Sequence, residues 1–321
     1  MSSIHTPEKK KDKNKSEETR PSPLDGEMSV RVMTFNTWRF GNYVKKGLSK
    51  LAAHINASDA DIIFLQEVTS MRLLNKLKPL VPTYHFAAKP FWKQNLGGTL
   101  VALITRHEIL SVYDPLESTF GEFVTGLNTF KQLFIGCTIR LNGSSKEIDA
   151  WSVHLVPYPS SPHKIVNLKR VPTSDEIEKC EKFRVHNATR MLTHRQFSRS
   201  LSQSSTRPII LGGDFNAPSH LDWTEDLADQ HNGQHAEWPV SAILTRNGFK
   251  DSYRVVHPDY RTHPGLTWST THKNEPQDRL DFIYYVGDRI RPIDSWITAG
   301  ENLDVEWPSD HYAVITDFVL S

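Results

Sequence analysis

The residues of this chain that are best suited to chemistry lie in two short polar motifs. Each motif stands at one end of an apolar run. Ser309-Asp310-His311 stands just before the apolar run Ala313-Val314-Ile315. Much earlier in the chain, Leu211-Gly212-Gly213 leads into Asp214-Phe215-Asn216, so an apolar strand ends in an acid and an amide. Sites in mixed α/β folds gather where strands end and loops begin. If the two tips converge, they bring oxygen ligands and a proton-transfer group into one pocket.

Further predicted strand ends also carry polar side chains. They are found at Asn36, Glu67, His154 and Asp281. Carboxylate and amide oxygens suit a hard cation such as Mg²⁺ or Mn²⁺, whereas zinc favours more His or Cys ligands. Two histidines and spare carboxylates are what acid–base chemistry on a phosphoester requires. These residue types therefore predict metal-dependent chemistry at a phosphate.

The elements that must position these residues can be read from hydrophobic periodicity. Residues 30–35 form a β-rich alternating run, 43–56 have apolar residues at helical spacing, and 61–65 form a short buried strand. Together they predict a strand–helix–strand unit whose strand tips present Asn36 and Glu67. Further strands are predicted at 99–105, 131–141, 148–154, 208–211, 280–285 and 312–319, and the longest helical candidate at 175–199. This mixture favours one compact α/β domain over residues 29–321.

Composition excludes several classes of protein. The chain has 38 basic and 37 acidic residues, which argues against a strongly basic nucleic-acid platform but leaves a local basic cleft open. Two cysteines rule out a disulfide scaffold and a thiolate zinc cluster, and they fit a reducing compartment. No apolar stretch approaches the roughly 20 residues that span a membrane.

Residues 1–28 are rich in Lys, Glu, Ser and Pro and contain almost no large apolar side chains. They cannot repay the entropy of ordering, so we predict a disordered charged tail. Its lysines resemble a nuclear-import or anionic-surface patch, although interspersed acids favour a solvated tail. Because the apolar core of a secretory signal is absent, we expect an intracellular protein, cytoplasmic or nuclear.

Six motifs in chain order resemble the endonuclease/exonuclease/phosphatase superfamily. They are Thr34-Phe35-Asn36-Thr37-Trp38, Leu65-Gln66-Glu67-Val68, Ser152-Val153-His154-Leu155, Gly213-Asp214-Phe215-Asn216, Arg279-Leu280-Asp281-Phe282 and Ser309-Asp310-His311. The resemblance runs from about residue 30 to residue 320. It implies the deoxyribonuclease I-like fold, an α/β four-layered α/β/β/α sandwich of two packed mixed β-sheets. The segments between the motifs look similar to largely uncharacterised members, so the branch and the substrate stay open.

The resemblance also implies a metal site. Glu67 matches the principal metal ligand of the family, and Asn36 lies beside it in the motif pattern. Asp310 is implied either as a direct ligand or as a support for one. The cofactor that follows is Mg²⁺ or Mn²⁺.

The catalytic residues implied by the resemblance come from the later motifs. Asp214 would orient or deprotonate the attacking water, and Asn216 would hold the phosphate. His311 would stabilise charge on phosphorus, with its ring fixed by Asp281. His154 would protonate or stabilise the leaving oxygen. The division of proton transfer among Asp214 and the two histidines stays open.

Three further residues are predicted to bind substrate. Trp38 and Trp307 adjoin motifs and could stack on a substrate, and Arg106 either reaches a phosphate or is a surface residue. The predicted function is divalent-metal-dependent hydrolysis of a phosphoester, with a phosphodiesterase or nuclease favoured over a phosphomonoesterase. The alternative is an inactive family member that binds a phosphate ligand or a nucleic acid. We expect a monomer whose partner is a phosphoester substrate, with nucleic acids among the candidates.

Overall fold

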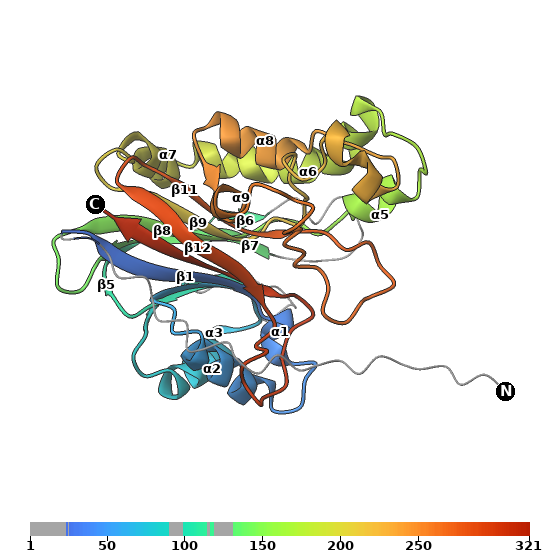
Figure 1. Cartoon of the computed structure of the whole chain (residues 1–321). Coiled ribbons are helices and arrows are strands. Elements are labelled where there is room, and N and C mark those ends of the chain that lie inside the picture. Colours follow the sequence, from blue (N-terminus) through green and yellow to red (C-terminus); the bar gives the residue numbers. More distant parts are fainter. Residues whose placement is uncertain (1–23, 25, 90–98, 114–115, 119–130) are drawn as a thin grey trace.

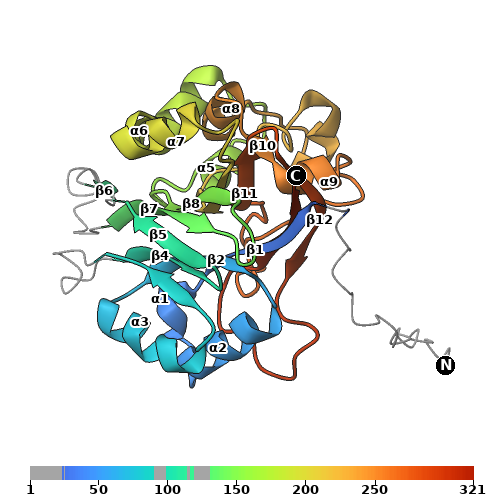
Figure 2. The same ribbon diagram turned by 90° about the vertical axis from the view of Figure 1, so that its left-hand side faces the viewer.

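The computed structural model describes residues 24, 26–89, 99–113, 116–118 and 131–321. Two β-sheets lie face to face in this part of the chain, and helices cover the outer face of each sheet (Figure 1). Figure 2 shows the same layers from the side, with the two groups of helices on opposite faces. The predicted α/β/β/α sandwich is confirmed.

The first sheet has six strands and is mixed. In spatial order they are β12 (Ile290–Thr298), β13 (Ala313–Leu320), β1 (Met28–Asn36), β2 (Ile62–Val68), β4 (Leu100–Thr105) and β3 (His85–Ala87). β1 and β2 are parallel, and the other neighbouring strands are antiparallel. The ends of β1 and β2 and the start of β13 therefore lie at the same edge.

The second sheet has seven strands. In spatial order they are β10 (Lys250–Asp251), β11 (Asp281–Val286), β9 (Ile209–Asp214), β8 (Glu147–His154), β7 (Lys131–Arg140) and β5 (Glu108–Val112), with β6 (Leu116–Ser118) also paired to β7. β8 and β9 are parallel, whereas β11 runs antiparallel to β9. The start of β11 therefore meets the ends of β8 and β9.

Both faces of the central strands are buried, and the side chains alternate between two cores. In β1, Val30 and Val32 pack between the two sheets, whereas Met33 and Phe35 pack under the helices. This alternation is the period-2 geometry of a strand. The helices on the first sheet are α1 (Trp38–Gly41), α2 (Gly47–Ala57) and α3 (Met71–Leu77), followed by the 3₁₀ helix η1 (Lys78–Leu80).

The second sheet is covered by a larger set of helices. They are α5 (Ser161–Val166), α6 (Ser174–Thr193), α7 (Arg195–Ser202) and α8 (Pro239–Arg246), with η3 (Glu225–His231) and α9 (Ser252–Val256) nearby. Ala188, Met191 and Phe197 pack against the sheet in the same buried cluster as Leu155 and Phe215. This helical layer therefore supports the loops that leave β8 and β9.

Two glycines allow the strand that leads into Asp214 to pack closely. A Cβ on Gly213 would lie 1.8 Å from the carbonyl oxygen of Val153 in β8, and one on Gly212 would lie 2.2 Å from the Phe64 ring across the sheet interface. Both contacts are shorter than van der Waals distance, so only glycine fits without a shift of backbone or ring. The Gly212-Gly213 pair is thus a packing requirement of the sandwich.

The structure corrects several expectations about elements. The predicted helix at 175–199 is two helices, since His194 has an extended backbone between α6 and α7. The long strand β12 and the short strands β3, β5, β6 and β10 were not predicted. Most of the tail predicted at residues 1–28 lies outside the described residues, but Met28 pairs with Leu320 as the first residue of β1. Among the described residues, no helix combines the length and apolar character needed to cross a membrane.

Candidate active site

The predicted site residues come together because of strand direction. β1 ends in Asn36, β8 ends in His154 and β9 ends in Asp214. Asp281 begins β11 and pairs with Asp214 of β9. On the other side of β9, Asp214 pairs with His154 of β8. One residue of the first sheet thus faces three of the second at a shared edge.

Asp214 is the centre of a buried polar cluster. Its Oδ2 accepts a hydrogen bond from the Asn36 Nδ2 at 2.9 Å and lies 3.3 Å from the His154 Nε2. Its Oδ1 accepts the backbone N–H of Asn216 at 2.8 Å, and the side chain of Asn216 donates to the carbonyl of Leu155 at 3.0 Å. The carboxylate is therefore held in one orientation by donors from both sheets.

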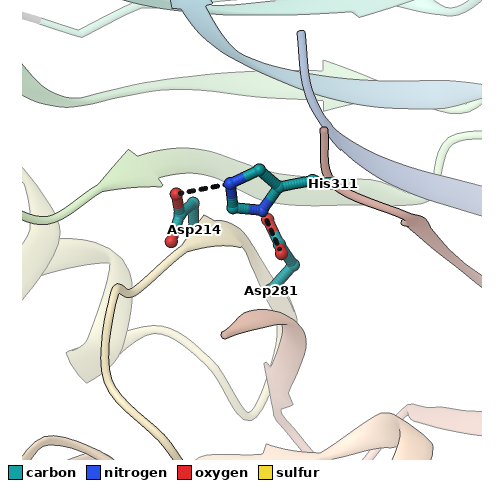
Figure 3. A group of neighbouring side chains, drawn as sticks. All are labelled: Asp214, Asp281 and His311. Carbon is teal, nitrogen blue, oxygen red and sulfur yellow. Dashed lines mark hydrogen bonds and ion pairs between the residues drawn. The ribbon is translucent and has the colours of Figure 1, made fainter. Parts of the chain in front are cut away.

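His311 lies between two carboxylates (Figure 3). Its Nδ1 is 2.8 Å from the Asp281 Oδ2, and its Nε2 is 3.9 Å from the Asp214 Oδ2. Burial lowers the pKa of the His311 imidazole, but the negative charges of Asp281, Asp214 and Asp310 outweigh burial and raise it to about 10. These charges favour the protonated form of the imidazole, and Asp281 sets the orientation of the ring.

The residues predicted to bind metal form an oxygen-rich group beside this cluster. Glu67 has a positive φ of 59° and lies at an irregularity in the pairing of β2 with β4. Its side chain reaches the turn after β1, where the Oε2 accepts the backbone N–H of Arg39 at 2.8 Å. Burial raises the pKa of Asp310 to about 6, His311 opposes that rise, and the charge of Glu67 adds to it. A cation would relieve this repulsion between carboxylates, so the donor set fits a hard divalent ion.

A second acidic group could in principle hold an ion. The ligand atoms of Asp214, Asp281 and His311 all lie within 4.8 Å of one another. The Nδ1 of His311, however, already contacts the Asp281 Oδ2 at 2.8 Å, which leaves one ring nitrogen for any further role. These three residues are better suited to proton transfer and charge stabilisation than to metal ligation.

Buried hydrogen bonds below the site join its parts. Ser309 donates to the carbonyl of Asn36 at 2.6 Å, which connects the motif before β13 to the end of β1. Gln66 donates to the Ser152 hydroxyl at 3.3 Å, which connects the two sheets below Glu67 and His154. These bonds make the position of each site residue depend on the packing of both sheets.

The structure assigns different surroundings to the three predicted substrate-binding residues. Trp38 directly follows the site, and its N–H donates to the Asn36 Oδ1 at 3.1 Å. The Trp307 ring stacks on Phe35 at 4.6 Å, and its Nε1 donates to the carbonyl of His311 at 2.7 Å, so Trp307 supports His311 from the core. The position of the Trp307 ring is explained by these packing contacts, without a role in stacking on substrate.

The prediction that Arg106 reaches a phosphate is wrong. Arg106 follows β4, which runs antiparallel to β2, so it lies at the edge opposite Glu67. Its guanidinium forms an ion pair with Asp59 and lies 5.1 Å from the centre of the Tyr84 ring. Arg106 is a surface residue, which was the alternative interpretation.

Sequence reasoning missed the loop before β11 as part of the site wall. The Trp268 ring meets His311 edge-on at 4.7 Å and stacks on His272 at 5.3 Å. The His272 Nε2 lies 3.9 Å from the Asp310 Oδ2. Periodicity predicts no element for this loop, so only its similarity to family segments could have pointed to it.

Known proteins resemble the chain in sequence and in fold. It matches the profile of the Endonuclease/Exonuclease/phosphatase family over residues 33–311. An uncharacterised protein of Caenorhabditis elegans is 30% identical over 309 residues, which cover 91% of each chain.

Two solved structures share the fold at low sequence identity. A functionally unknown protein of Enterococcus faecalis has a TM-score of 0.64 at 16% identity, over 91% of this chain and 100% of that one. The human Nocturnin catalytic domain with bound sulfate has a TM-score of 0.58 at 19% identity, over 91% and 95% of the chains. The family profile spans both polar motifs and the ends of the strands that converge on Asp214. This chain therefore belongs to the endonuclease/exonuclease/phosphatase family.

Proposed function

We propose that this protein is a divalent-metal-dependent phosphoester hydrolase, and that a phosphodiester is its preferred substrate. Members of the family usually hydrolyse phosphoester bonds and generally depend on a divalent metal. The observation that carries the proposal is the buried cluster in which Asp214 contacts Asn36, with His154 and His311 on either side. This cluster combines a carboxylate, an amide and two imidazoles, which suit acid–base chemistry at a phosphate.

Asp214 is the residue proposed to orient the attacking water and accept its proton. Both of its oxygens are held by donors, from Asn36 and from the backbone of Asn216, so the carboxylate is preorganised. The positive ring of His311 would stabilise charge that develops on the phosphate oxygens. His154 would donate a proton to the leaving oxygen.

Glu67, Asp310 and Asn36 are the residues proposed to hold Mg²⁺ or Mn²⁺. When bound, such an ion supplies charge neutralisation at a phosphoryl oxygen. The carboxylates of Glu67 and Asp310 and the amide oxygen of Asn36 are the kinds of ligand that such an ion prefers. We also expect a monomer in an intracellular compartment, and the free, buried thiols of Cys137 and Cys180 fit a reducing compartment.

The test is turnover by purified protein of a generic phosphodiester and a generic phosphomonoester, with Mg²⁺, with Mn²⁺ and with EDTA. We expect metal-dependent turnover that Glu67→Ala abolishes, because the metal affinity falls. His154→Ala and His311→Ala should each lower kcat by about 10²–10⁴-fold. His85→Ala is the control, since His85 is exposed on β3, away from the site.

Each outcome has a clear meaning. Absence of metal-dependent turnover on both ester types would refute the hydrolase proposal and favour the inactive binding module. Full activity of Glu67→Ala, His154→Ala or His311→Ala would remove that residue from the site. A melting temperature of Glu67→Ala that equals that of the wild type without metal would show that lost activity is not lost folding.

A further inference from the structure

The segment that follows Asn36 is a left-handed turn. Trp38, Arg39 and Phe40 have φ values of 45°, 52° and 62°, and Gly41 follows at 69°. Three non-glycine residues in succession with this backbone are rare, because Cβ crowds the following carbonyl oxygen. Such strain persists only where the surrounding structure enforces it, and it concentrates at functional sites.

Contacts with the core and with the site enforce the turn. Phe40 is 2% exposed and packs in the core below the first sheet. The backbone N–H of Trp38 donates to the Asn36 Oδ1 at 3.1 Å, and that of Arg39 donates to the Glu67 Oε2 at 2.8 Å. Since backbone groups make these contacts with the site, the side chains of Trp38 and Arg39 are left for another role.

Arg39 is a cationic residue whose backbone N–H is bound to Glu67 of the proposed metal-binding group. It is half-buried, and its guanidinium makes no hydrogen bond or ion pair within the part of the chain that the structure describes. Arg31 and Arg106, by contrast, are both paired with aspartates. A guanidinium on a residue bound to this site, with no counter-ion in the described part of the chain, is available to bind a phosphate through two parallel N–H groups.

Aromatic side chains accompany this cation. The Tyr43 ring is 61% exposed and lies 4.8 Å from that of Trp38. Among the large apolar side chains that are exposed in the described residues, two are aromatic, Tyr43 and Tyr158. Tyr43 follows Asn36 and Tyr158 follows His154, so both lie on loops that leave the site. Exposed rings of this kind stack on unpaired bases.

We infer that the turn and Tyr43 form a nucleotide subsite next to the scissile phosphate, with Arg39 on a second phosphate and Tyr43 stacked on a base. The inference rests on the proposed hydrolase function and names its substrate class, a single-stranded oligonucleotide. An inositol phosphate would use the cation but leave the exposed rings without a partner. The combination of ring and cation therefore favours the nucleotide.

The experiment compares kcat/KM on a single-stranded oligonucleotide, on an inositol polyphosphate and on methyl p-nitrophenyl phosphate, which has one phosphate and no base. Arg39→Gln should lower kcat/KM on the oligonucleotide by about 10–100-fold, as expected for a lost charged hydrogen bond. Tyr43→Leu should lower it by about 5–100-fold, whereas Tyr43→Phe, which keeps the ring, should restore it. On methyl p-nitrophenyl phosphate, which offers no second phosphate and no base, both losses should be smaller than about twofold.

The control is Arg289→Gln, which should leave kcat/KM on every substrate unchanged. Arg289 is exposed and precedes Ile290, whose partner Leu320 lies at the end of β13 farthest from His311. Anisotropy of a labelled oligonucleotide in EDTA measures binding without turnover, and Arg39→Gln should raise the Kd about tenfold or more.

Several results would overturn the inference. Equal losses on the oligonucleotide and on methyl p-nitrophenyl phosphate would show that Arg39 supports the site rather than a substrate. Preferred hydrolysis of the inositol polyphosphate would replace the nucleotide with another class. If no ester is hydrolysed at all, the proposed function fails, and an unchanged Kd for Arg39→Gln would separately refute the subsite.

Discussion

Replacing Asp278 with asparagine should stabilise this protein at alkaline pH and have little effect near pH 4. Asp278 is buried in the segment before β11, and its Oδ1 accepts the Trp223 Nε1–H at 3.0 Å. Burial raises the pKa of Asp278 to about 7, against the opposing effect of the Trp223 hydrogen bond and with a further contribution from the charge of Asp222. The folded protein therefore favours the neutral carboxyl.

The sign and size of the effect follow from proton linkage. The ordinary pKa of the carboxyl is 3.8, so between pH 4 and pH 7 the folded state keeps a proton that the unfolded state has released. The free energy of unfolding then falls as pH rises through this window and is constant above it. A shift of roughly three pKa units, at about 1.36 kcal/mol each, gives a ceiling of about 4 kcal/mol. Local relaxation around the charge reduces this ceiling. We therefore expect Asp278→Asn to raise the free energy of unfolding above pH 7 by about 1–4 kcal/mol.

Asparagine avoids the free-energy cost of burying a carboxylate, because it carries no charge. It still offers an oxygen that accepts the Trp223 Nε1–H. Urea unfolding of Asp278→Asn and wild type at four values between pH 4.5 and pH 8.5 measures the difference. The stabilisation should grow with pH and level off above pH 7. Asp226→Asn is the matched control, since Asp226 is exposed and its substitution should show no such rise.

Two results would refute the reasoning. If Asp278→Asn is less stable than wild type at pH 8.5, the carboxylate is ionised in the fold and makes favourable contacts. If the stabilisation is the same at every pH, it comes from packing or hydrogen bonding and not from the cost of burying a charge.

Three further substitutions test the packing that supports the site. Gly213→Ala places a Cβ 1.8 Å from a backbone carbonyl of β8, so thermal unfolding should show a loss of about 1–3 kcal/mol, together with lower activity as Asp214 shifts. Arg184→Met leaves the fully buried Glu181 without its counter-ion, and urea unfolding should show a loss of about 3–5 kcal/mol that a second change, Glu181→Leu, largely reverses. Trp307→Phe removes the hydrogen bond to the carbonyl of His311 and should cost about 1 kcal/mol in urea without changing KM. A raised KM would show instead that substrate stacks on Trp307.

Most strands were predictable because each is a short apolar run with a polar residue at its end. β12 was missed, since it includes Pro292 and an irregularity between Pro292 and Asp294 at the edge of the first sheet. Proline within a run argues against a strand unless the strand lies at an edge, and edge position is not visible in sequence. The interruption at His194 was missed for the opposite reason, because no proline or glycine marks the end of α6 in the sequence.

Arg106 shows why proximity to a strand end is not proximity to the site. The arginine follows a predicted strand just as Asn36 does, and both strand predictions were correct. β4 runs antiparallel to β2, however, so its end lies at the opposite edge. Arg39, one residue beyond the Trp38 motif, is the arginine whose backbone contacts Glu67.

The sequence by itself determined the chemistry available to this protein: the acids, amides and histidines at strand ends, and hence oxygen ligands with acid–base groups. Only the tertiary structure decided which of them meet. Asn36 binds Asp214 across 178 residues, and His311 is oriented by Asp281 rather than by its neighbour Asp310. Local sequence specifies a strand through short-range periodicity, whereas strand direction and register depend on the packing of the whole sandwich.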